Sequence, residues 1–143
     1  MKLSRRDLGF LLPALAGAAA VAQETQLQTL PSKVYRNDQI PYGGNEQKKS
    51  RKFFNGLTHA GFNLEMHETI LGPGVQSHPP HKHVHEEIMT VLEGTVEAYV
   101  EGKTEAAPAG SVIYFASNQM HKVRNGGTTP CRYYVVELRG NDA

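Results

Sequence analysis

The stretch His78-Pro79-Pro80-His81-Lys82-His83-Val84-His85-Glu86-Glu87 places four of the chain's seven histidines and two glutamates within ten residues. In a β-strand, side chains at positions i and i+2 lie on the same face. We therefore expect His81 and His83 to converge on one ion, and Glu87 to join them after a turn. Imidazole and carboxylate groups ligate Zn, Fe, Mn, Ni and Cu. Taken alone, this stretch is equally compatible with a solvated, histidine-rich loop that binds metal adventitiously.

The residues on either side of this stretch favour a folded site. Gly74 and a proline pair precede the histidines, and the apolar run from Ile88 to Leu92 leads to Gly94. This pattern predicts a strand that ends in a turn glycine. The histidine-rich segment is thus expected to enter a β-domain.

The pattern His81-x-His83-x3-Glu87-x6-Gly94 resembles the first conserved motif of the cupin superfamily. Gly74 lies one residue further upstream than that motif has its glycine.

A second stretch, Gly110-x5-Ala116-x-Asn118-x2-His121-x3-Asn125, resembles the second cupin motif. Ala116 stands where proline is usual, and Asn118 stands where glycine is usual. Asparagine adopts the left-handed backbone conformation more readily than other non-glycine residues, so the turn is expected to form. We interpret Asn125 as structural.

The resemblance covers roughly Phe53 to Leu138, and two linked motifs are more specific than either alone. It implies that one divalent transition metal is bound inside a small β-barrel by four residues: His81, His83, Glu87 and His121. One or two coordination positions would stay open for water or substrate, as in catalytic metal sites. Glu87 would serve as catalytic base if it loosened from the metal.

The other histidines are assigned lesser roles. His78 and His85 are expected to be exposed, or to orient the ligands from a second shell. His59 and His67 are interpreted as structural bystanders. We expect His67 to face solvent, because it alternates with three apolar residues: Phe62, Leu64 and Met66.

Residues 1–22 resemble a bacterial twin-arginine signal peptide, with Arg5-Arg6 behind Ser4 and a small-residue cleavage pattern ending at Ala22. The apolar run of residues 8–22 would span only about 22 Å as a helix, against about 30 Å of hydrocarbon. Cleavage would leave no stable membrane span, and the alternative is an uncleaved anchor. We expect a periplasmic or secreted protein.

The resemblance to a twin-arginine signal also bears on the metal. That pathway exports folded proteins, so the metal would be bound in the cytoplasm. There the supply of each metal ion, and not the order of their affinities, decides which ion is trapped in the folding protein. This favours Mn or Fe, with Ni, Cu or Zn as alternatives.

Without the leader, 121 residues remain, enough for one domain with a core. They hold 12 basic and 13 acidic residues, which argues against nucleic acid as a partner. The sole cysteine, Cys131, has no internal disulfide partner and alternates with Tyr133 and Val135, as a buried strand thiol does.

The chain is divided into residues 1–22, the leader, residues 23–50, an extended N-terminal arm, and residues 51–143, the cupin β-barrel. The arm is either a tether or an edge strand through Val34 and Tyr35 that joins a neighbouring copy. The basic cluster from Lys48 to Lys52 is interpreted as a solvated turn. Because cupins commonly pair through sheet edges, the resemblance also implies a homodimer.

Short strands are expected at residues 62–71, 86–92, 95–100, 111–115, 121–125 and 131–138, separated by turns rich in glycine and proline. The fold class is therefore all-β, and the resemblance implies a double-stranded β-helix, or jelly-roll barrel.

The leading functional hypothesis is a metal-dependent enzyme acting on a small organic molecule, of the dioxygenase-type oxidoreductase class. One alternative is a non-catalytic periplasmic protein that binds metal or a small ligand. Another is an isomerase or lyase acting on a sugar acid. Five residues are candidates for contacts with the small molecule in the barrel mouth: Met89, Tyr99, Tyr114, Arg124 and Tyr133.

Overall fold

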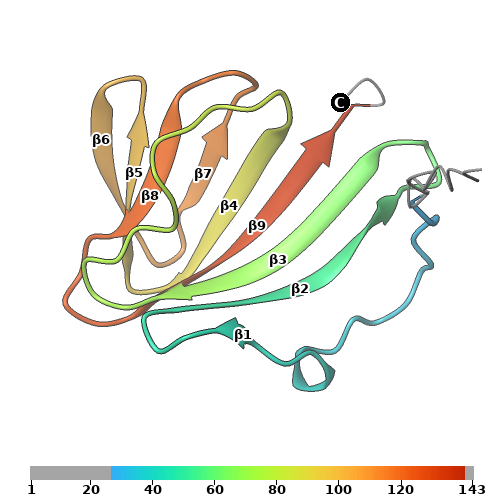
Figure 1. Cartoon of the computed structure of the whole chain (residues 1–143), viewed down its shortest axis with the longest axis horizontal. Helices are drawn as coiled ribbons and strands as arrows, with labels where there is room; N and C mark the ends of the chain where they lie inside the picture. The colour runs from blue at the N-terminus through green and yellow to red at the C-terminus, as the bar shows by residue number, and fades with distance from the viewer. Residues whose placement is uncertain (1–26, 141–143) are drawn as a thin grey trace, which may run out of the picture.

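The computed structural model describes residues 27–140, which form two antiparallel β-sheets that face each other (Figure 1). The six-stranded sheet has the order β1 (Gly43–Gly44), β2 (Lys48–Leu57), β3 (Asn63–Leu71), β9 (Cys131–Arg139), β4 (Glu86–Glu93) and β7 (Val112–Phe115). The three-stranded sheet has the order β6 (Lys103–Pro108), β5 (Thr95–Val100) and β8 (His121–Asn125). One short 3-10 helix, η1 (Asn37–Gln39), precedes the strands. The predicted all-β class is confirmed.

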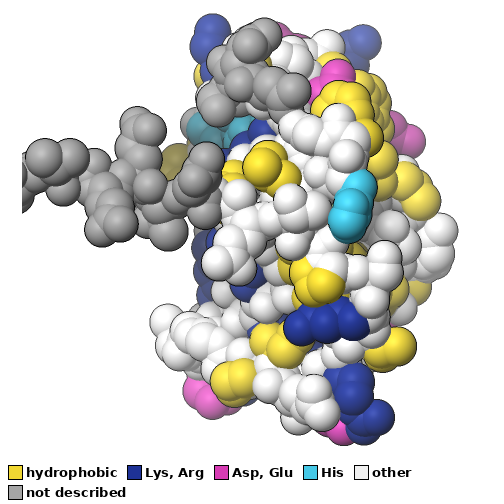
Figure 2. All heavy atoms as spheres, turned by 90° about the vertical axis from the view of Figure 1, so that its right-hand side faces the viewer, with side chains coloured by type: hydrophobic (Ala, Val, Ile, Leu, Met, Phe, Trp, Pro, Cys, Tyr) yellow, Lys and Arg dark blue, Asp and Glu magenta, His cyan; other side chains and the backbone are white. Residues whose placement is uncertain are grey.

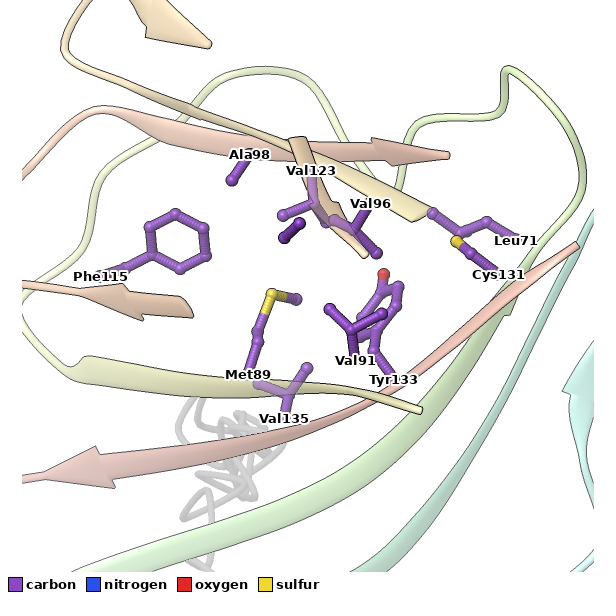
Figure 3. Packing of buried hydrophobic residues seen from close by; sticks show 11 residues of the cluster. Leu71, Met89, Val91, Val96, Ala98, Phe115, Val123, Cys131, Tyr133 and Val135 are labelled. Carbon is purple, nitrogen blue, oxygen red and sulfur yellow. The ribbon is translucent and has the colours of Figure 1, made fainter. Parts of the chain in front are cut away.

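The core lies between the two sheets because each strand points alternate side chains inward. On β5 the inward residues Val96 and Ala98 are buried, and on β9 the residues Cys131, Tyr133 and Val135 are buried. Figure 3 shows side chains from the two sheets pointing toward one another. The core cluster is completed by Leu71, Met89, Val91, Ala107, Phe115 and Val123.

Two turns adopt the conformations that their residues predict. Asn118 has φ 60°, in the left-handed region, as expected for its place in the second motif. Gly94, between β4 and β5, has φ 71°, and a Cβ there would lie 2.9 Å from the Cα of Cys131. Only glycine meets both conditions without strain.

The six predicted strands agree with the observed strands to within one residue at each end. The strands β1, β2 and β6 were not predicted. The sequence of β6 is largely exposed and lacks apolar alternation. The basic cluster was predicted as a solvated turn, and this is wrong, because Lys48 to Lys52 begin β2 and pair with β3.

The N-terminal arm runs along the free edge of β2 and packs over part of the outer face of the six-stranded sheet. Near its start, the N–H of Leu57 donates to the Gln28 carbonyl oxygen at 2.9 Å. Further along, the ring of Tyr35 packs on Phe54 with centroids 5.0 Å apart. Val34 stays 83% exposed and lies outside the strands.

Beneath the arm lies a buried ion-pair network. Glu68 is fully buried on the outer face of β3, and its carboxylate accepts hydrogen bonds from Arg51 at 2.5 Å and from Arg132 at 2.9 Å. The Arg51 guanidinium stacks on the Tyr42 ring at 4.3 Å. The network therefore joins β2, β3 and β9 to the arm.

The predicted leader lies outside the described residues. Among residues 27–140, no helix is long and apolar enough to cross a membrane. Figure 2 shows one face of the molecule, on which basic and acidic side chains are scattered among polar and hydrophobic ones.

Candidate metal centre

The histidine-rich segment lies in the connection between β3 and β4, and two further elements complete the cluster. His81 and His83 lie before β4 and outside the strands, and His81 forms an isolated bridge with His121 on β8. In that bridge the N–H of His121 donates to the His81 carbonyl at 2.8 Å, and the reverse bond is 3.1 Å. Glu87 points inward from β4. The bridge thus brings the two distant motifs together.

The four predicted ligands converge in the structure. One donor atom from each of His81, His83, Glu87 and His121 lies within 4.8 Å of the others. The His83 Nε2 is 2.9 Å from Glu87 Oε1, and the His121 Nε2 is 3.8 Å from Glu87 Oε2. His121 is 1% exposed and Glu87 is 7% exposed. The donors therefore meet inside the barrel and not on its surface.

The hydrogen bonds of the imidazoles leave ring nitrogens free for a metal. The His83 Nδ1–H donates to the His85 carbonyl at 2.9 Å, and the His121 Nδ1–H donates to the Gln119 carbonyl at 2.8 Å. Both Nε2 atoms then present lone pairs to the centre of the cluster. Among the described residues, the buried His121 Nε2 and His81 Nδ1 have no hydrogen-bond partner.

This arrangement fits a bound cation. The lone pair of His83 Nε2 faces the Glu87 carboxylate, so a positive charge or a proton is required between two acceptors. Buried unpaired nitrogens are also costly. A divalent transition metal satisfies all of these atoms with three nitrogen ligands and one oxygen ligand.

Burial sets the protonation of the cluster. It lowers the pKa of His121 and of His81, and in His81 the neighbouring His121 and His83 lower the pKa further. The pKa of Glu87 is raised by burial, which the charge of His83 partly opposes. Metal binds to the neutral form of imidazole. The lowered pKa values keep His81 and His121 in that form near neutral pH, so no proton has to leave them when metal binds.

We expect the metal-free protein to lose stability as the pH falls below about 6.5, the ordinary value for histidine. The unfolded chain binds protons there that the buried His81 and His121 do not bind, so the free energy of unfolding rises with pH. The raised pKa of Glu87 makes the free energy of unfolding fall as the pH rises, which opposes the contribution of the histidines. The histidine contribution is therefore measured as the difference in pH dependence between wild type and a histidine variant. Melting temperatures after chelation, between pH 7.5 and 5, should fall more steeply for wild type than for His121→Gln. The exposed His59→Gln should keep the wild-type slope.

His85 and His78 flank the ligands. The His85 ring stacks on His83 with centroids 3.5 Å apart, and its Nε2 lies 3.6 Å from Glu87 and 3.4 Å from Glu137. His85 is therefore not exposed but lies against two of the candidate ligands, His83 and Glu87. His78 packs edge-on against His81 at 4.1 Å, on the rim of the cavity. Desolvation, chiefly, lowers the pKa of His78 to about 4, although part of the ring stays open to solvent.

The cluster opens into a cavity of about 390 Å³ lined by β2, β3, β9 and β4. The prediction that His67 faces solvent is wrong, because His67 lines this cavity together with Glu65 and Glu137. The three residues form a second group whose donor atoms lie within 4.8 Å of one another. The apolar residues Leu64 and Met66, which occupy the opposite face of β3, are only partly buried.

Glu65 and Glu137 were missed by the sequence analysis. Each has a cationic partner: the Lys52 Nζ is 2.9 Å from Glu65, and Arg139 is 2.6 Å from Glu137. The available signal was the alternation of Glu65, His67 and Thr69 in phase with the buried Leu71.

The five candidate contact residues separate into two groups. Met89 and Tyr133 line the cavity next to the cluster. Tyr99 and Arg124 instead line a different hollow, near Glu97, and Tyr114 is 55% exposed on β7. Alternation alone did not distinguish the cavity from the outer surface.

Comparisons with known proteins agree with this geometry. A family model described as a cupin domain matches residues 67–137. No curated protein matches the sequence.

Solved structures resemble the chain in fold. KdgF from Halomonas sp. superimposes with a TM-score of 0.64 at 16% identity, covering 78% of this chain and 98% of that chain. An RmlC-like cupin from Shewanella frigidimarina NCIMB 400 gives 0.62 at 17% identity, covering 78% and 95%. A predicted oxalate decarboxylase from Thermotoga maritima gives 0.62 at 22% identity, covering 76% and 100%. Residues 67–137 of this chain therefore match the cupin domain model, and the chain shares the fold of these solved cupin structures.

Proposed function

We propose that this protein is a metal-dependent enzyme that acts on a small organic molecule, of the dioxygenase-type oxidoreductase class. The observation that carries the proposal is the cluster of His81, His83, Glu87 and His121, which opens into a half-open cavity lined by both polar and apolar side chains. A cavity of about 390 Å³ lies in the range that holds small ligands. A purely structural metal site would have its donors closed off by packing.

The four donors would hold one divalent metal, Mn or Fe by preference and Ni, Cu or Zn as alternatives. Such an ion supplies Lewis-acid polarisation of a bound oxygen or, for a redox-active metal, reaction with dioxygen. The chain's own residues contribute the surroundings. Phe115 stacks on the His121 ring with centroids 4.4 Å apart, which fixes the ligand and keeps water from its back face.

Proton transfer in the cavity is assigned to Glu87 and His85. Burial raises the pKa of Glu87 in the protein without metal, and with a metal bound Glu87 would serve as base only if it loosened from the ion. His85 Nε2 lies between Glu87 and Glu137, so it can pass a proton between the ligand cluster and the neighbouring strand β9. Glu137 orients this imidazole.

His85→Ala is expected to keep one bound metal per chain and to lower turnover by about 100-fold. The His83 Nδ1–H bonds the backbone carbonyl of residue 85, which alanine retains, so the ligand keeps its orientation. Metal analysis together with steady-state rates would check this. Loss of the metal in His85→Ala would show that His85 is itself a ligand.

The function is tested by elemental analysis of protein purified without added metal, followed by oxygen uptake over catechols, flavonols, diketones and small acids. One tightly bound iron, manganese, nickel or copper with oxygen uptake supports the dioxygenase class. Variable or multiple metals would instead support a binding or storage protein.

A second candidate is an isomerase or lyase acting on a sugar acid. The wall formed by Glu65, His67 and Glu137 favours it, because carboxylates and imidazole hydrogen-bond the hydroxyl groups of such a molecule. One stoichiometric metal with no oxygen uptake on any substrate would favour this candidate over the first.

A further inference from the structure

The cavity wall contributed by β2 is basic. Lys48, Ser50 and Lys52 alternate along the strand and line the cavity on the side opposite to β4. These residues belong to the cluster that the sequence analysis interpreted as a solvated turn. Their position on a strand turns their side chains toward the candidate metal centre.

Most charges in the cavity are already balanced. Lys52 pairs with Glu65 at 2.9 Å, and Glu137 pairs with Arg139 at 2.6 Å. Arg51, also on β2, is bound to the buried Glu68. Lys48 differs from these residues, because no carboxylate lies within 4 Å of its ammonium group within residues 27–140.

The ammonium group of Lys48 reaches the segment that carries the metal ligands, and Lys48 lines the same cavity as His81 and His83. Its Nζ donates to the backbone carbonyl of Ser77, in the connection that carries the histidines. The next residue, His78, packs on the ligand His81 at 4.1 Å. Lys48 and the ligands His81 and Glu87 therefore line one cavity, in which a single small molecule can contact both.

We propose that Lys48 forms a subsite for the carboxylate of the substrate, and that the substrate class is a small carboxylic acid with a second oxygen donor, such as a 2-hydroxy or 2-keto acid. This inference rests on the proposed function of the same cavity. Lys52 and Arg139 neutralise Glu65 and Glu137. The remaining charges are +2 from a divalent metal, +1 from Lys48 and −1 from Glu87, which leaves a net charge of +2 in the cavity. An anion is the complement of that excess. An ammonium group also forms charge-assisted hydrogen bonds with carboxylate oxygens.

The test compares acids with their neutral amides on the manganese-loaded protein. Pyruvate is paired with pyruvamide, and glycolate with glycolamide, and affinities are measured by calorimetric titration. Wild type should bind each acid more tightly than its amide. Lys48→Gln should weaken binding of the acids by about 10- to 100-fold and leave the amides nearly unchanged.

Lys49→Gln is the matched control. This neighbouring lysine pairs with Glu46 at 3.4 Å, so its removal should leave both affinities unchanged. Equal acid binding by wild type and Lys48→Gln would overturn the subsite, as would the lack of a preference for acids in wild type.

Repeating the titrations on metal-free protein separates this inference from the proposed function. A chain that binds no metal would contradict the metal-dependent function. Without metal, Glu87 cancels the charge of Lys48, so the subsite is then judged by comparing wild type with Lys48→Gln. Weaker acid binding by Lys48→Gln supports the subsite, and equal acid binding overturns it.

Discussion

Replacing His121 by alanine is expected to abolish stoichiometric metal binding, with affinity lowered by more than about 100-fold. His121 is the ligand that comes from the second motif, and its Nε2 is buried and unpaired among the described residues. Its removal leaves three donors that all come from residues 81–87. The ion would then no longer tie β8 to the connection between β3 and β4.

The loss should also appear as a loss of metal-dependent stability. Binding to the folded state alone stabilises a protein by about 4 kcal/mol when free metal exceeds the dissociation constant 1,000-fold. The melting temperature of wild type should therefore fall on chelation, and that of His121→Ala should not respond. Elemental analysis and thermal melts with and without chelator provide both readings.

Two further variants make the His121 result interpretable. His81→Ala removes a ligand from the other motif and should give the same loss. His59→Ala removes an exposed histidine and should keep full metal occupancy. A His121→Ala protein that is folded by circular dichroism and retains one equivalent of metal would disprove the ligand assignment.

Glu68→Ala is expected to destabilise the fold by about 3 to 5 kcal/mol, because it removes the shared anion of a buried network. Glu68 is 0% exposed, and it binds Arg51 from β2 and Arg132 from β9. Without it, the largely buried Arg51 guanidinium would lack a carboxylate partner. Chemical denaturation would measure the change through the midpoint at constant slope.

Two controls accompany the Glu68 variant. Glu105→Ala removes an exposed glutamate from β6 and should change stability by less than about 0.5 kcal/mol. Glu68→Gln keeps the shape and loses the charge, so it should be intermediate. A Glu68→Ala protein as stable as Glu105→Ala would show that the network contributes nothing to folding.

The all-β class followed from strand alternation and turn residues in the sequence. The convergence of His81, His83, Glu87 and His121 was implied by the resemblance to the two cupin motifs. Strand alternation marks β5 and β9, and the left-handed conformation of Asn118 follows from the residue itself. The turn at Gly94 likewise requires glycine at that position.

Only the tertiary structure determined which face of each remaining strand is inside. The barrel interior is partly a polar cavity, so Glu65 and His67 point inward while the apolar Leu64 and Met66 lie on the outer face of β3. Alternation along a strand shows which side chains share a face, but it does not show which of the two faces lines the cavity. The basic cluster from Lys48 to Lys52 became a cavity wall for the same reason: its strand is stabilised by pairing with β3, a contact that no local pattern reports.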